Sequence, residues 1–292
     1  MNRYHAIVLV NRSAETLGFL AHERCPAMLP IGNKPLIQIA LEELYDVGIR
    51  TCTVSDDGEQ PDLRRFVGDG SRWGLSVAWK DLSTANEAAF AAIAGDRTLL
   101  AVRGDMLRPF GLLEEALRRS GEQQSADIYT ALGVAVGVHD QAGLGRISWP
   151  EVTATCRLVP CLVDTVAIYH AANIMALQGL VPGVRSAGRK APDEIIVGKG
   201  SVVLSTQAPE KSVVIGTNCL IERGVRLGRN VVVGNNCLID RDAELEDCVV
   251  LPGTYVGRGA VLTGKVVSGK RIHCLQRPNT CAIDDPRLLD AA

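Results

Sequence analysis

The sequence predicts an α/β domain with a largely parallel, Rossmann-like sheet, followed by a left-handed parallel β-helix. Strand-like and helix-like segments alternate through the first part of the chain, which is the pattern of an α/β fold. From Ile215 onward an aliphatic residue recurs at every sixth position, which is the pattern of a repeat fold. We therefore expect an α/β domain over residues 1–190 and a β-helix domain with a short C-terminal tail over residues 191–292.

The α/β domain begins with a buried strand in "HAIVLV". The segment "NKPLIQIALEELYDVGI" predicts a helix, with Asn33 as its N-cap, Pro35 in the first turn and Gly48 at its C-terminal end. The next strands are "TCTVS" and "TLLAV", and the latter runs directly into "RGD". Asp105 therefore lies beyond the carboxyl end of a strand, where open α/β sheets bind their ligands.

The repeat has a six-residue period in two series. The aliphatic series, which we expect to point inward, consists of Ile215, Ile221, Leu227, Val233, Ile239, Leu245 and Leu251. The second series follows four positions later, is mostly small, and consists of Cys219, Val225, Val231, Cys237, Ala243, Val249 and Tyr255. Three six-residue faces make one coil of a left-handed β-helix, so Cys219 and Cys237 stack in adjacent coils. We interpret that pair as core filling.

Composition indicates an ordinary globular protein, with 47% hydrophobic and 22% charged residues among 292. The formal net charge of −2 and the lack of a basic block argue against nucleic-acid and membrane partners. No run approaches the roughly 18 apolar residues of a membrane-spanning helix, and the N-terminus lacks a signal-peptide pattern, so we expect a cytoplasmic protein. The nine cysteines show no CxxC spacing, which predicts buried thiols rather than a zinc site.

Two segments of the α/β domain resemble those of a known family. "LPIGNKPLIQIALEELYDVGI" and "FVGDGSRWGLSV" are similar to segments of the sugar-1-phosphate nucleotidyltransferases, in the same order and ahead of a β-helix. The chain looks most like the mannose-1-phosphate guanylyltransferases and glucose-1-phosphate adenylyltransferases. The resemblance covers nearly the whole chain. It implies a reaction in which a nucleoside triphosphate and a sugar 1-phosphate give a nucleotide-sugar and pyrophosphate, with magnesium as cofactor.

The loop after the first strand departs from the family pattern. When the family's "LaGGxGTRLxPLTxxxPKPL" is laid on this chain with its first residue on Leu9, the alignment needs no gap as far as Pro35. Its paired glycines fall on Asn11 and Arg12, and its lysine falls on Pro26. Side chains at the glycine positions block the close approach of backbone N–H groups to phosphate, and the loss of the lysine removes a cation. We therefore predict that Asn11–Thr16 does not cradle a phosphate.

Other positions of the family's site are kept only in part. The resemblance places candidate nucleotide or sugar contacts at Asn11, Arg12, Ser83, Thr84, Ala85 and Asp105. Asp105 matches the family's first metal-binding aspartate, but the second has no counterpart in "VPGVRSAGRKAPDE". No lysine occurs between Lys80 and Lys190 to hold the sugar phosphate. One carboxylate does not make a magnesium site for a triphosphate. Asp105 is thus a catalytic and metal-binding candidate only if the protein is active.

These departures favour a catalytically impaired homologue over an enzyme. We expect a regulatory or partner subunit of an active pyrophosphorylase, or a nucleotide-sugar binder, in nucleotide-sugar or polysaccharide synthesis. The β-helix predicts a homo-oligomer. One alternative is an active sugar-1-phosphate nucleotidyltransferase with a rebuilt loop and magnesium at Asp105. A second is an acyltransferase β-helix with His273 as base, for which a solvated histidine near the end of the coils is the competing interpretation.

Overall fold

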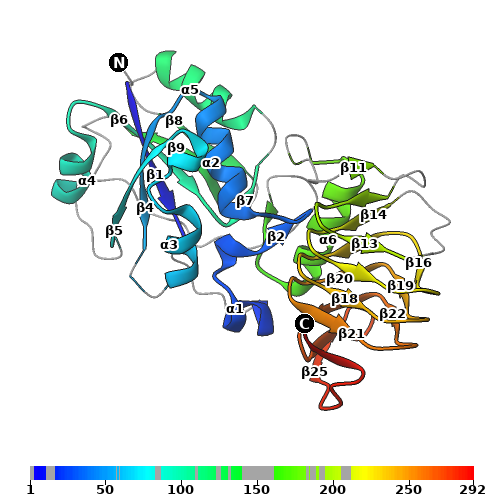
Figure 1. The fold of residues 1–292 in the computed structure, drawn as a ribbon. Helices are drawn as coiled ribbons and strands as arrows, with labels where there is room; N and C mark the ends of the chain where they lie inside the picture. Colours follow the sequence, from blue (N-terminus) through cyan, green and yellow to red (C-terminus); the bar gives the residue numbers. More distant parts are fainter. Residues whose placement is uncertain are drawn as a thin grey trace. The chain divides into compact units, whose positions relative to one another are not determined.

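The computed structural model describes residues 3–10, 17–56, 58, 60–82, 87–108, 111–122, 126–130, 133–139, 161–181, 184, 189–190, 195–204 and 212–292. The chain forms two compact units, whose elements are labelled in Figure 1. Unit 1 is drawn from residues 1–15, 24–29 and 35–164, and unit 2 from residues 16–23, 30–34 and 165–292. The predicted division between residues 190 and 191 stays a prediction.

Unit 1 is an α/β structure. Its elements are β1 (Tyr4–Leu9), η2 (Pro26–Met28), α2 (Leu36–Asp46), β4 (Thr51–Ser55), α3 (Pro61–Val67), η3 (Ser71–Trp73), β5 (Ser76–Lys80), α4 (Glu87–Ala94), β6 (Thr98–Arg103), β7 (Met106–Leu107), α5 (Leu112–Glu122), β8 (Ala126–Thr130), β9 (Gly133–His139) and β10 (Cys161–Leu162). The short strand β3 (Lys34–Pro35) joins the two units in sequence.

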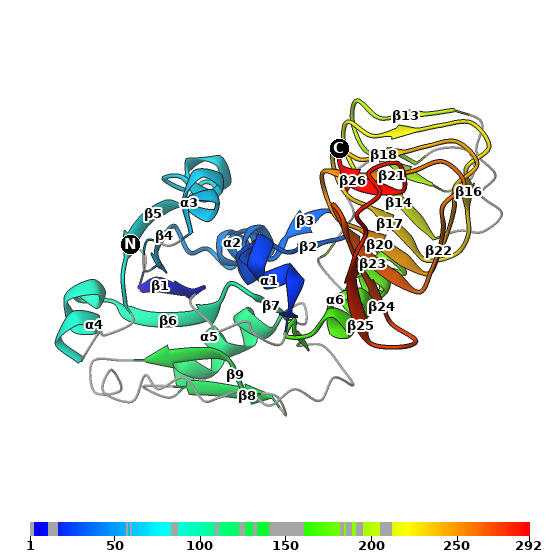
Figure 2. The same cartoon turned by 90° about the horizontal axis from the view of Figure 1, so that it is seen from below.

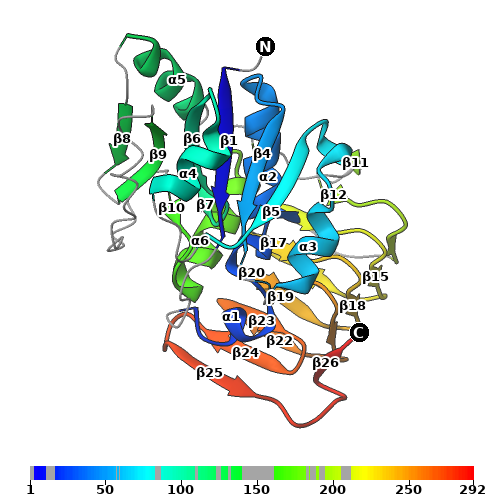
Figure 3. The same ribbon diagram turned by 90° about the vertical axis from the view of Figure 1, so that its left-hand side faces the viewer.

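The main sheet of unit 1 has six strands in the order β5-β4-β1-β6-β9-β8 (Figure 3). The first four strands are parallel, whereas β9 and β8 pair antiparallel. Strand order reverses at β1, because β4 lies on one side of it and β6 on the other. This reversal is the switch point at which Rossmann-like sheets form their ligand crevice. The predicted α/β class with a largely parallel sheet is therefore confirmed, and β9 and β8 add an antiparallel pair at one side.

Helices cover both faces of this sheet. Alternate residues of β1 point to opposite sides, as the pleat requires. Ala6 and Val8 pack in a cluster with residues of α2, α3 and α5. Ile7 and Leu9 pack in a second cluster with Phe90 and other residues of α4. The residues of β1 named here are all less than 9% exposed, so its near-continuous hydrophobic run is explained by burial on both faces.

The first long helix begins later than the sequence pattern predicted. α2 starts at Leu36, and its N-cap is Pro35, which makes no side-chain cap. Asn33 is not an N-cap: its φ is +67°, and its side-chain amide donates to the Val233 carbonyl oxygen at 2.9 Å, within unit 2. The predicted C-terminal glycine is confirmed, because Gly48 has φ +87° and its N–H bonds to the Tyr45 carbonyl oxygen.

Unit 2 consists mainly of short strands. Its elements are α1 (Phe19–Glu23), β2 (Pro30–Ile31), α6 (Val166–Leu177), β11 (Arg189–Lys190), β12 (Ile196–Val197), β13 (Val202–Val203), β14 (Val213–Ile215), β15 (Leu220–Ile221), β16 (Arg226–Leu227), β17 (Val231–Val233), β18 (Leu238–Ile239), β19 (Glu244–Glu246), β20 (Cys248–Val250), β21 (Thr254–Val256), β22 (Val261–Thr263), β23 (Lys265–Ser268), β24 (Arg271–Cys274), β25 (Asn279–Ala282) and β26 (Leu289–Ala291).

The strands of unit 2 form three sheets through which the chain passes in turn (Figure 2). Their orders are β11-β12-β14-β17-β20-β23-β24-β25, β13-β15-β18-β21-β26 and β16-β19-β22. Within each sheet, neighbouring strands from β12 to β23 are parallel. Paired residues are 18 positions apart in the earlier pairs and 17 apart in the later ones. These parallel sheets are compatible with the predicted β-helix.

The six-residue series holds for its first six members and then shifts by one. Those six belong to one buried cluster, but the position after Leu245 is filled by Val250, not by the predicted Leu251. The pairing of Val233 with Val250 shows this directly. The cause is a single-residue turn at Asp247, between β19 and β20, with φ +48°. The second series shifts likewise: Cys248 rather than Val249 joins the cluster, and Thr254 rather than Tyr255 is fully buried at the next coil.

A column of small polar side chains joins successive passages of the chain. Ser201 Oγ donates to the Gly216 carbonyl oxygen at 2.7 Å, Cys219 Sγ to Gly234 at 3.0 Å, and Cys237 Sγ to Leu251 at 3.2 Å. The two cysteines are each 2% exposed. The prediction that they only fill the core is therefore incomplete, since each thiol also satisfies a buried carbonyl group of the next passage.

Among the described residues, no helix is both long enough and apolar enough to span a bilayer. 

Candidate active site

The candidate site lies at the carboxyl edge of the parallel strands of unit 1. β1 ends at Leu9 and β6 ends at Arg103, on either side of the switch point, and Asp105 follows β6. Gly104 is closely packed, because a Cβ there would lie 3.0 Å from Ile37 Cδ1 and from Val10 Cγ1, so these side chains would have to shift to admit one.

Asp105 is buried, and Arg103 binds its carboxylate. The Nε and Nη2 groups of Arg103 donate to Oδ1 and Oδ2 of Asp105, each at 3.0 Å. The side chains are 10% and 0% exposed, respectively. This is the bidentate fork geometry in which arginine binds carboxylates most strongly. The aspartate therefore has a cationic partner built into the protein.

Arg108 extends this arrangement into a buried network of two arginines and two carboxylates. Its Nη1 donates to the Arg103 carbonyl oxygen, and its Nε and Nη2 donate to Glu43 Oε2 at 2.8 and 2.7 Å. The Arg108 side chain is fully buried. Burial raises the pKa of Glu43, and the Arg108 cation opposes that rise. Arg108 thus helps to position Arg103, the residue that binds Asp105, by donating to its backbone carbonyl group.

The donor set at Asp105 does not fit a magnesium ion. Magnesium is usually bound by one or two carboxylates together with waters and substrate phosphates. Both oxygens of Asp105 accept N–H groups of one guanidinium. Over the part of the chain that the structure describes, no group of three His, Cys, Asp or Glu side chains could hold a metal. A metal at Asp105 would lie beside the Arg103 guanidinium, whose positive charge would repel it.

A second carboxylate at this edge is also compensated by a cation. Asp56 follows β4, is 1% exposed and forms an ion pair with Arg64 of α3. It also accepts the Gly58 N–H at 3.1 Å. Arg64 in turn lies 5.3 Å from the centroid of the Trp79 ring. The edge therefore carries internally paired charges at the ends of both β4 and β6.

The segment that aligns with the family's lysine supplies no cation. Pro26 and Ala27 are buried at the start of η2, and Cys25 is 8% exposed. Burial raises the pKa of the Cys25 thiol to about 11, and the nearby Asp105 and Asp56 carboxylates contribute to the rise. The thiol is therefore protonated at neutral pH. The predicted loss of a phosphate-binding charge at Pro26 stays a prediction.

All five of the other predicted contacts lie outside the described residues. These are Asn11, Arg12, Ser83, Thr84 and Ala85. The prediction that Asn11–Thr16 does not cradle a phosphate also lies there. Asp105 is therefore the one predicted contact that the described structure places.

His273 belongs to the antiparallel hairpin of β24 and β25 in unit 2. Its Nδ1 lies 2.8 Å from Thr280 Oγ1, and its ring stacks on Phe19 with centroids 6.5 Å apart. Burial and the nearby Lys265 lower the pKa of the imidazole. The side chain is half-buried rather than fully solvated. These contacts give His273 a structural role in the hairpin.

Sequence reasoning missed Arg103, although the signal was present in "VRGD". At the end of a strand, two residues of opposite charge separated by one position can lie on the same side of the backbone. Arg108 and Glu43 gave no such signal, because they are far apart in the sequence.

Comparisons with known proteins agree with the fold. A family model described as nucleotidyl transferase matches residues 5–158, a span that holds Asp105 and nearly all of the six-stranded sheet. A glucose-1-phosphate thymidylyltransferase from an Actinoplanes species is 25% identical over 202 residues, covering 61% of this chain and 66% of the relative. One from Streptomyces griseus is 28% identical over 119 residues, covering 36% and 34%.

The chain thus spans just under two thirds of the first relative's length and about a third of the second's. A solved Bacillus anthracis structure named for the same activity aligns with a TM-score of 0.39 and 13% identity, over 48% of this chain and 73% of that one.

Proposed function

This chain belongs to the nucleotidyl transferase family, and from that premise we propose that it is a catalytically impaired member. Its role would be to bind a nucleotide-sugar or to regulate an active pyrophosphorylase, in nucleotide-sugar or polysaccharide synthesis. The relatives named above are sugar-1-phosphate nucleotidyltransferases, which supports this substrate class. We further propose that the sheets of unit 2 form a left-handed β-helix of hexapeptide repeats through which the protein assembles as a homo-oligomer.

The observation that carries the proposal is the ion pair of Arg103 with Asp105. Transfer of a nucleotidyl group concentrates negative charge, so catalysis depends on cations placed against the phosphates. A magnesium ion at Asp105 would either share the carboxylate with the Arg103 cation or displace it, and displacement from a buried pair costs about 3–5 kcal/mol. That penalty corresponds to a loss of roughly 10²–10⁴ in metal affinity.

The test is an assay of pyrophosphate release with magnesium. Each of ATP, GTP, CTP, UTP and dTTP is combined with glucose 1-phosphate or mannose 1-phosphate. We expect no turnover in the ordinary enzyme range of about 1–10³ s⁻¹. Turnover in that range that Asp105→Asn abolishes would refute the proposal. The matched control is Asp62→Asn, because it makes the same chemical change at a side chain of α3 that is 77% exposed.

The competing function is an active sugar-1-phosphate nucleotidyltransferase with a rebuilt loop. Its support is the retained topology, since Asp105 lies at the switch point where such sheets bind ligands. It predicts magnesium-dependent triphosphate binding, and the same assay separates the two functions. Acyl transfer with His273 as base stays a prediction from the sequence, tested by acyl-CoA binding in the wild type and in His273→Ala.

A further inference from the structure

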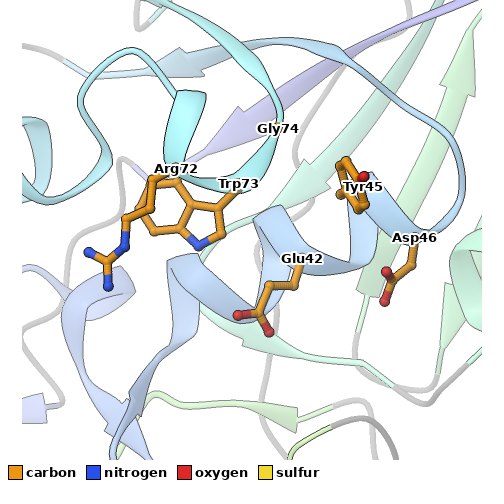
Figure 4. A pocket seen from close by; sticks show the side chains of 6 residues that line it. All are labelled: Glu42, Tyr45, Asp46, Arg72, Trp73 and Gly74. Carbon is orange, nitrogen blue, oxygen red and sulfur yellow. The ribbon is translucent and has the colours of Figure 1, made fainter.

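Unit 1 contains a pocket that the proposed function does not use. It has a volume of about 340 Å³ and is lined by Glu42, Tyr45 and Asp46 of α2 together with Arg72, Trp73 and Gly74 (Figure 4). That volume is at the lower end of the range for small-molecule sites. Figure 4 shows the Trp73 indole coming from the η3 turn and the Tyr45 ring coming from the helix. We call it the Tyr45–Trp73 pocket.

The wall of this pocket depends on a specific backbone shape. Gly74 has φ +69°, and a Cβ there would lie 2.6 Å from Tyr45 Cε2. Glycine therefore lets the tyrosine ring lie directly against the turn. On the other side, the Trp73 ring packs on Phe66 with centroids 5.5 Å apart. The Trp73 ring thus packs on a neighbouring ring, and the Tyr45 ring lies against the turn while 42% exposed.

The charges around the pocket are balanced. Two guanidinium groups already lie over the rings, with Arg50 4.0 Å from the Tyr45 centroid and Arg72 5.2 Å from the Trp73 centroid. A cationic ligand would compete with these arginines for the rings. An anionic ligand would meet Glu42 and Asp46, whose carboxylates line the same pocket. The ligand that fits best is uncharged.

The lining also specifies the kind of uncharged ligand. Carboxylates accept hydrogen bonds from hydroxyl groups, and a guanidinium donates hydrogen bonds to hydroxyl oxygens. Tyr45 is 42% exposed even with Arg50 over its ring, so part of an apolar aromatic surface is open to C–H groups. A sugar ring combines several hydroxyl groups with an apolar C–H face. We propose that the Tyr45–Trp73 pocket binds an uncharged sugar, either free or at the end of a glycan.

This pocket is separate from the candidate active site. β4 begins just after α2 and β5 begins just after η3, so the pocket lies where these parallel strands start. The Ser76 N–H donates to the Arg50 carbonyl oxygen, which joins the two segments at that edge. Asp105 lies at the opposite edge, where the strands end. An uncharged sugar in this pocket would not compete with a ligand at the carboxyl edge.

The test is saturation-transfer NMR and calorimetric titration of the full chain with D-glucose, D-mannose and maltose as probes. D-glucose 1-phosphate serves as the charged comparison. We expect saturable binding of at least one uncharged probe, weakened roughly tenfold or more in Trp73→Ala and in Tyr45→Ala. Trp79→Phe, which changes a tryptophan outside the lining, should bind as the wild type does.

Several results would overturn the proposal. One is no saturable binding of any uncharged probe to the wild type. Another is binding that neither pocket variant weakens, and a third is preference of the pocket for the sugar phosphate. Should Trp73→Ala melt at a much lower temperature, Tyr45→Ala decides, because that side chain is already 42% exposed. If neither substitution changes the affinity for D-glucose 1-phosphate, that ligand binds at the carboxyl edge and not in this pocket.

Discussion

Replacing Arg103 by methionine should destabilise unit 1 by about 3–5 kcal/mol, because the change leaves a fully buried carboxylate without its guanidinium. Methionine keeps much of the side-chain volume, so the loss reports the ion pair rather than a cavity. Asp105→Asn should cost a similar amount by leaving the guanidinium unpaired. The double variant should lose less than the sum of the two, with a coupling free energy of about 0.5–3 kcal/mol.

The assay is urea denaturation followed by tryptophan fluorescence. The chain has three tryptophans, and all lie in the segment of unit 1 that runs to residue 164, so the signal follows this unit. Arg65→Met with Asp62→Asn is the control cycle, since these side chains are 79% and 77% exposed. An exposed pair contributes about 0–1 kcal/mol. If each single variant at Arg103 or Asp105 loses less than about 1 kcal/mol of unfolding free energy, and the two losses simply add in the double variant, the pair does not stabilise unit 1 as a buried ion pair.

Three further predictions concern stability. Burial, with the nearby Arg97 and Lys80 cations, lowers the pKa of His5 from 6.5 to about 4. The unfolded chain therefore binds more protons between these values, so up to about 3 kcal/mol of stability present above pH 6.5 is lost by about pH 4. His5→Gln should flatten this slope in urea denaturation across pH, and an unchanged slope would exclude His5 as its source. Cys237→Ser should be tolerated, whereas Cys237→Ala should cost about 1–3 kcal/mol more, because it removes the donor to a buried carbonyl group. Equal melting temperatures would contradict this. Gly216→Ala should cost at least 1–3 kcal/mol, roughly the cost of overpacking, because its Cβ would lie 2.6 Å from the Gly234 carbonyl carbon. A melting temperature equal to that of the wild type would contradict the close approach.

The sequence pattern predicts the repeat of unit 2 well and misses its one irregularity. A six-residue period needs only local information, because each aliphatic side chain stacks on its counterpart one passage later. The shift after Leu245 depends on how Asp247 turns the chain in a single residue at φ +48°. This backbone conformation is not encoded in the pattern of hydrophobic residues. Since Leu251 is itself buried, the sequence offered no sign that Val250 takes the stacked position.

The location of the candidate site could be predicted from the sequence, but the ion pairs and hydrogen bonds within it could not. Asp105 could be placed beyond a strand from local sequence, and the structure puts it at the switch point. Its pairing with Arg103 required the geometry of both side chains, and the support from Arg108 and Glu43 required the fold, since those residues are 65 positions apart. Asn33 could not be placed from local sequence either. Asparagine is a residue type that favours N-caps, but this side chain hydrogen-bonds to a residue 200 positions away.

The most direct test of the central claim is calorimetric titration of nucleoside triphosphates and nucleotide-sugars with and without magnesium, in the wild type and in Asp105→Asn. We expect that magnesium does not strengthen triphosphate binding in either protein, because Arg103 already binds the carboxylate that a metal would need. Triphosphate binding that requires magnesium in the wild type and disappears in Asp105→Asn would contradict it.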